Sequence, residues 1–114
     1  MTQEDKDLLL KDLCGRLPYK VKVQDTYYKS LEPAPIWLLD LDAQSVRLFA
    51  DEGYQSIEYI KPYLFPMSKI VEEIVTTSNK HIAVNVDFFH KNHIDYRGLI
   101  PKGLANDATG LNIY

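Results

Sequence analysis

The chain has 114 residues, of which 46% are hydrophobic and 25% charged, and its formal net charge is −3 at pH 7. These values predict one soluble globular domain over residues 1–114, with a core that needs no disulfide or metal for stability. The negative charge argues against a nucleic-acid-binding surface, which needs an excess of basic side chains, and a single cysteine excludes an internal disulfide framework.

No apolar run in the sequence approaches the roughly 20 residues that a helix needs to cross a bilayer. The first five residues are acidic rather than basic, which is not typical of a signal peptide. We therefore expect a cytoplasmic protein without a membrane segment. Cys14 lies among leucines, so we expect a small buried apolar side chain rather than a reactive thiol.

The first predicted element is a helix over residues 2–15. Thr2 can cap its start, and Asp5, three residues later, can complete a capping box. Leucines at helical spacing give this segment an apolar stripe. Gly15 and Pro18 predict where the helix ends.

Short segments with β-strand character follow at residues 19–23, 36–41, 46–49 and 57–60. Their close spacing leaves no room for crossover helices, which favours an antiparallel meander over parallel βαβ units. In the second of these segments, alternation predicts that Trp37, Leu39 and Leu41 share one face.

Residues 61–67 contain Pro62 and Pro66, which hold the preceding residues in extended conformations. We interpret this segment as a stiff apolar connector. Ser68 is expected to cap a helix that runs to about residue 78. Residues 81–86 fit a strand or a helix, and residues 87–92 are predicted to be helical.

The predicted fold is therefore α+β: an N-terminal helix, a four-stranded antiparallel meander, and two C-terminal helices packed on one face of the sheet. Its core is expected to include Trp37, Leu39, Leu41, Leu48, Ile74 and Phe89.

Residues 87–98 carry the densest set of chemically active side chains, including His90 and His93. Helical spacing would place His93 on one stripe with Val86, Phe89 and Tyr96, as a histidine at the edge of the core, and His90 on a wetter flank. The alternative is a metal site, since His90 and His93 would be neighbours on a helix. A third ligand would have to come from elsewhere, such as His81, because Asp87 and His93 lie too far apart along a helix.

Residues 95–98 form a second polar group, Asp-Tyr-Arg-Gly. The guanidinium of Arg97 suits a carboxylate or phosphate, and Asp95 could hold it in place. The other interpretation is a local ion pair followed by a helix stop at Gly98.

Sequence patterns of known catalytic sites are absent. The five glycines are isolated, so there is no phosphate-binding loop, and there is no G-x-S-x-G motif. We therefore predict a protein that is not an enzyme and needs no cofactor.

Three phrases of the sequence occur together: LLLKDLCGRLPY (residues 8–19), IKPYLFPMS (residues 60–68) and HIDYRGLI (residues 93–100). This combination resembles a family of short, uncharacterised Bacteroidetes proteins often found in prophage-like and other mobile regions. The resemblance spans most of the chain, with residues 24–57 matching least. Relatives tend to carry Arg where this chain has Phe65, so a charged binding site is not implied. The resemblance implies a bacterial, cytoplasmic and phage-linked setting, and no established activity.

These observations favour a small non-catalytic interaction or regulatory module that binds another protein or itself. The candidate partner-binding residues are Tyr63, Phe65, Tyr96 and Arg97. One alternative is a nucleic-acid-associated accessory protein of a mobile element, with a small basic and aromatic surface built from Lys20, Lys22, Lys61 and Tyr63. The other alternative is a metal-dependent enzyme that uses His90 and His93.

Overall fold

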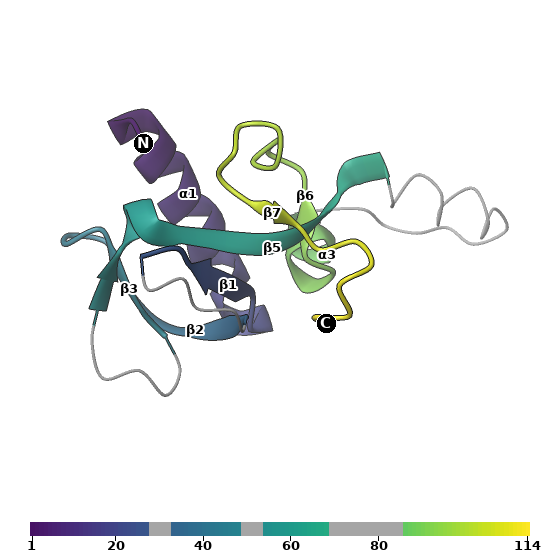
Figure 1. Ribbon diagram of the computed structural model, residues 1–114, viewed down its shortest axis with the longest axis horizontal. Helices are drawn as coiled ribbons and strands as arrows, with labels where there is room; N and C mark the ends of the chain where they lie inside the picture. Colours follow the sequence, from purple (N-terminus) through teal and green to yellow (C-terminus); the bar gives the residue numbers. More distant parts are fainter. Residues whose placement is uncertain (28–32, 49–53, 69–85) are drawn as a thin grey trace, which may run out of the picture.

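The structure is a computed structural model that describes residues 1–27, 33–48, 54–68 and 86–114. Helix α1 (Gln3–Arg16) lies against a seven-stranded mixed sheet, and a short helix, α3 (Val86–Lys91), follows near the C-terminal end (Figure 1). The α+β class is confirmed, but the sheet is larger than predicted and not purely antiparallel. The helix expected from Ser68 onward and most of residues 81–86 lie outside the described residues.

Helix α1 begins as the sequence predicts. The Asp5 amide donates to Thr2 Oγ1 at 3.1 Å, and the Thr2 amide donates to Asp5 Oδ2 at 3.4 Å, which completes the capping box. The α-helix ends at Arg16, one residue after the predicted Gly15 and before Pro18, and the chain continues as a 3-10 turn, η1 (Leu17–Tyr19). Pro18 is accommodated at the start of this turn, where its missing N–H is not needed.

An antiparallel meander forms the first part of the sheet. It contains β1 (Lys22–Asp25), β2 (Ala34–Asp40), β3 (Ser45–Leu48) and β4 (Tyr54–Ser56), paired in that order. The meander is therefore confirmed, but its first and fourth strands are misplaced in the prediction. Residues 57–59 form a 3-10 turn, η2 (Ile57–Tyr59), rather than a strand.

The predicted connector is in fact a central strand, β5 (Ile60–Pro66). It pairs antiparallel with β1 and parallel with two short strands, β6 (Ile94–Asp95) and β7 (Asn106–Asp107). The amide of Thr26 donates to the carbonyl of Tyr59, which makes these two residues a hydrogen-bonded pair. From that pair onward, non-hydrogen-bonded and hydrogen-bonded pairs alternate along β1 and β5. Pro62, opposite Val23, falls at a position without a hydrogen bond toward β1, and the strand tolerates it there.

The core lies between α1 and the sheet, where β1 and β5 cross the helix in Figure 1. It includes Leu9 and Leu13 from α1 and Val23 and Leu64 from the sheet, all fully buried. The prediction of a buried Cys14 is wrong, because this side chain is exposed.

The predicted inward face of the second strand is also wrong, because β2 contains a bulge. Ile36 pairs with Leu48, but Leu38 pairs with Arg47, so Trp37 is one extra residue on the β2 side. Ile36 and Leu48 are buried, whereas Trp37 is 52% exposed. Of the other predicted core residues, Leu41 is exposed, Leu39 and Phe89 are half-buried, and Ile74 lies outside the described residues.

Candidate functional site

The histidine-rich segment is only partly helical. Helix α3 ends at Lys91, His93 takes a left-handed backbone conformation with φ of 58°, and Ile94 begins β6. The predicted helical stripe through His93 and Tyr96 is therefore wrong, and Val86 at its start is exposed.

His90, predicted to lie on the wetter flank of the helix, is instead the more buried histidine of the pair. It is 8% exposed, and its ring lies against Gly15 of α1, where a Cβ atom would come within 2.3 Å of His90 Cε1. Its Nε2 is 2.8 Å from the hydroxyl of Tyr96. Burial lowers the pKa of His90, and Arg16 lowers it further, so the imidazole is neutral at pH 7.

Beside His90 lies a buried group of charges that joins α1 to the C-terminal part of the chain. Asp12 and Arg16 are both fully buried, and Arg16 Nε donates to Asp12 Oδ2 at 2.7 Å. The other carboxylate oxygen accepts from Arg97 Nε at 3.1 Å. Arg16 also donates to the carbonyl oxygens of Phe89 and Ile94. The arrangement satisfies its own donors and acceptors, as a structural network does.

The predicted contact between Asp95 and Arg97 is replaced by others. Asp95 accepts hydrogen bonds from the amides of Leu99 and Ile100, at 2.8 and 2.9 Å, and so orders the loop that follows β6. Gly98 has the predicted positive φ, 73°, but it lies in this loop and does not end a helix.

The histidines do not converge on a metal site in the described part of the chain. The ring of His93 stacks on that of Tyr114 at a centroid distance of 3.6 Å, while His90 is bonded to Tyr96. Burial lowers the pKa of His93 to about 4. Across residues 1–27, 33–48, 54–68 and 86–114, no three His, Cys, Asp or Glu side chains could together hold a metal ion. His81 lies outside these ranges.

The four predicted partner-binding residues offer little free surface. Tyr63 is 9% exposed, which leaves its side chain little area to contact a partner. Phe65 is half-buried, Tyr96 stacks on Phe89 at 5.1 Å, and Arg97 is held by Asp12. Tyr96 and Arg97 follow β6, which pairs with the end of β5. Most of the contacts of the four residues are made within the chain.

The basic and aromatic surface expected of a nucleic-acid-binding protein is also reduced. Lys22 Nζ donates to the carbonyl of Ile113 at 2.7 Å, close to the ring of Tyr114. Since Tyr63 is buried, only Lys20 and Lys61 of the proposed set remain for such a role.

The sequence reasoning missed an exposed aromatic surface on the sheet. The β2 bulge places Trp37 and Leu38 together, opposite Arg47, and Arg47 in turn pairs with Tyr54 of β4. The guanidinium of Arg47 lies 4.9 Å from the ring centre of Trp37 and 6.0 Å from that of Tyr54. We call this set the outer-face patch: Trp37, Leu38, Arg47 and Tyr54.

The patch escaped prediction because no residue in the β2 sequence marks a bulge. Strict alternation, which the prediction assumed, places Trp37 on the same face as Leu39. The patch can be recognised only from the pairing of Arg47 with Leu38 and Tyr54. Strand pairing is a tertiary property that the local sequence does not show.

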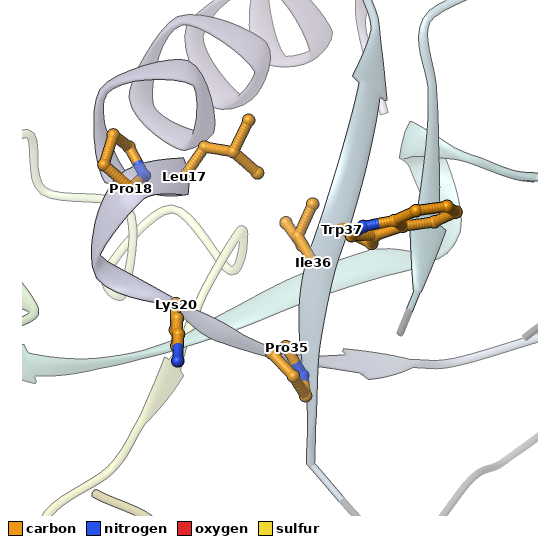
Figure 2. Close-up of a pocket in the computed structure, with 6 residues that line it drawn as sticks. All are labelled: Leu17, Pro18, Lys20, Pro35, Ile36 and Trp37. Carbon is orange, nitrogen blue, oxygen red and sulfur yellow. The ribbon is translucent and has the colours of Figure 1, made fainter. Parts of the chain in front are cut away.

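A pocket of about 400 Å³ opens between η1 and β2. We call it the η1–β2 pocket. Figure 2 shows Leu17 and Ile36 facing each other across it, Pro18 and Pro35 at its edges, and the ring of Trp37 on the opposite side of β2. It is lined by Leu17, Pro18, Lys20, Pro35, Ile36 and Trp37.

Comparisons with protein-family models, with curated proteins and with solved structures found no match for this chain. None of the helices in the described part of the chain is long and apolar enough to cross a membrane.

Proposed function

We propose that the protein is a non-catalytic module that binds another protein through the outer-face patch. The observation that supports this most is the exposure of two large aromatic rings on β2 and β4, the strands on either side of β3. Trp37 is 52% exposed and Tyr54 is 56% exposed, with Arg47 between them. Trp, Tyr and Arg are the residue types most enriched among the side chains that dominate the free energy of protein association.

The packing of the patch also suits binding. Each aromatic ring can bury a large area at a low cost in side-chain entropy, because it has only two rotatable bonds. Arg47 already lies over both rings, so less conformational freedom is lost when a partner covers them. Leu38, which is 40% exposed, adds apolar area to the patch.

Binding of a protein fits this surface better than binding of nucleic acid. The patch contains one cation, and the whole chain carries a net charge of −3, whereas phosphate binding draws on several basic side chains. The sequence resemblance implies a bacterial, cytoplasmic and phage-linked setting. In that setting the partner would be a cytoplasmic protein.

The test is affinity capture with three immobilised forms of the full chain: wild type, Trp37→Ala and Leu111→Ala. Leu111 is also exposed, at 53%, but lies outside the patch, so its variant controls for the loss of an exposed apolar side chain. Bacteroidetes lysate is passed over each form with and without nuclease treatment, and the bound proteins are quantified by mass spectrometry. We expect a protein that wild type and Leu111→Ala retain and Trp37→Ala loses.

Three results would contradict the proposal. The first is a partner that all three forms retain equally, since the patch would then not be the contact surface. The second is recovery that disappears on nuclease treatment, which favours the nucleic-acid alternative. The third is a dimer in light scattering that Trp37→Ala converts to a monomer, because the patch would then be covered by a second copy.

A further inference from the structure

The η1–β2 pocket combines rigid apolar walls with one cation. Pro18 and Pro35 have fixed backbone φ angles, so the edges of the pocket keep their shape without a ligand. Leu17 and Ile36 supply apolar surface between them (Figure 2). A volume of about 400 Å³ falls in the lower part of the range of ligand pockets, roughly 300–1,000 Å³.

Among the described residues of the lining, Lys20 is the only charged one, and its backbone is held in an unusual conformation. Its φ of 57° is left-handed, and its amide donates to the carbonyl of Leu17 at 3.3 Å, which closes the η1 turn. The turn therefore fixes the point from which the lysine side chain leaves the backbone, next to the apolar walls.

The ammonium group of Lys20 forms no ion pair or hydrogen bond with the described residues, and its side chain is exposed. Two other lysines are engaged: Lys6 pairs with Glu58 at 3.9 Å, and Lys22 donates to Ile113. A ligand that is complementary to the pocket therefore has an apolar group followed closely by a negative charge.

The pocket is continuous with the outer-face patch through β2. Trp37 contributes to the lining, while its ring lies on the other side of the strand, beside Arg47 (Figure 2). A chain that covers Trp37 therefore also reaches the rim of the pocket, because Trp37 belongs to both surfaces. This continuity favours a segment of a bound protein over a free small molecule.

We propose that the η1–β2 pocket binds an extended segment of the partner protein, with an apolar side chain between Leu17 and Ile36 and an Asp or Glu at Lys20. This inference rests on the proposed function and adds the chemistry by which the partner is recognised.

The probe is a phage-displayed library of random dodecapeptides, selected on the immobilised full chain. We expect enrichment of Asp or Glu within a few positions of an apolar residue. A selected peptide, synthesised with a fluorescent label, should bind about tenfold more weakly to Lys20→Glu in a polarisation assay, because attraction becomes repulsion. Lys102→Glu, at an exposed position outside the pocket, makes the same charge change and should bind as wild type does.

Selected peptides without an acidic preference, or equal binding by Lys20→Glu and wild type, would overturn the inference. A second overturning result is that no peptide is selected but sodium hexanoate changes the NMR chemical shifts of Lys20 and Ile36. The ligand of the pocket would then be a small apolar acid. Trp37-dependent capture of a protein that Lys20→Glu still retains would leave the proposed function intact and refute the pocket alone.

Discussion

Replacing Gly15 by Ala tests the contact between α1 and His90. On an isolated helix this change stabilises, by up to about 1 kcal/mol, since glycine loses more backbone entropy on folding than alanine does. In this fold, the new Cβ atom would lie 2.3 Å from His90 Cε1 and 2.9 Å from both ring nitrogens. Such distances require the imidazole to move.

The free-energy cost of that movement follows from the surroundings of His90. The ring is 8% exposed and bonded to the Tyr96 hydroxyl, so it cannot simply swing into solvent. Forcing an extra carbon into a packed interior costs about 1–3 kcal/mol, and loss of the bond to Tyr96 costs about 1 kcal/mol more. After the gain in helix propensity, we expect Gly15→Ala to lower the free energy of unfolding by about 1–3 kcal/mol.

The assay is urea-induced unfolding followed by circular dichroism, with a double-mutant cycle. The same Gly15→Ala change is made in wild type and in His90→Ala, where the ring is absent. In the second background we expect the substitution to become neutral or stabilising, because only the helix-propensity term remains. Cys14→Ala, on the exposed side of the same helix, is the control and should change stability by less than about 0.5 kcal/mol.

A stabilised Gly15→Ala protein in the wild-type background would refute the reasoning. So would an equal loss of stability in both backgrounds, because the cost would then not come from His90.

Two further predictions concern charge and can be measured in the same unfolding assay. Asp12→Asn should lower the free energy of unfolding by about 3–5 kcal/mol, because Arg16 loses its charged partner inside the protein; Asp42→Asn, at an exposed position, should have little effect. The pKa of His93 is about 4 in the folded protein, against 6.5 for an unperturbed histidine. Between these two pH values the unfolded chain binds more protons than the folded protein does. The free energy of unfolding therefore falls as the pH falls from 6.5 to 4. His93→Asn, which tolerates the left-handed backbone, should reduce this pH dependence, with the part due to His90 remaining; an unchanged slope would contradict the low pKa.

The start of α1 could be predicted in atomic detail because its determinants are local. Thr2 and Asp5 are three residues apart, and each completes its hydrogen bond without help from the rest of the fold. The contact that Gly15 makes near the end of the same helix could not be predicted in this way. Gly15 indicates a helix stop in isolation, but here it provides the space into which His90 packs, and that contact joins residues 75 positions apart.

The strands show the same limit. Considered in the sequence alone, Pro62 argues against a central strand. It is compatible with β5 because the hydrogen bond from Thr26 to Tyr59 fixes which pairs of β1 and β5 are hydrogen-bonded, and Pro62 is not in one of them. The β2 bulge likewise depends on which residue of β3 faces Trp37, and pairing register is not written in the local sequence. One inserted residue reverses the expected face of Trp37 and creates the outer-face patch.

Under the proposed function, a partner does not bind at the densest chemistry of the sequence, and the contacts of these side chains give a physical reason. His90, Arg97 and Asp12 carry charge or titrate, but each is held by a partner inside the protein, and disrupting their network would cost folding free energy before it could assist a ligand. The side chains of β2 and β4 have simpler chemistry, but a partner can cover them without breaking a core contact. For a small chain that binds through packing, exposed area on a rigid sheet is the better criterion, and by that criterion Trp37 and Tyr54 are the residues to mutate first.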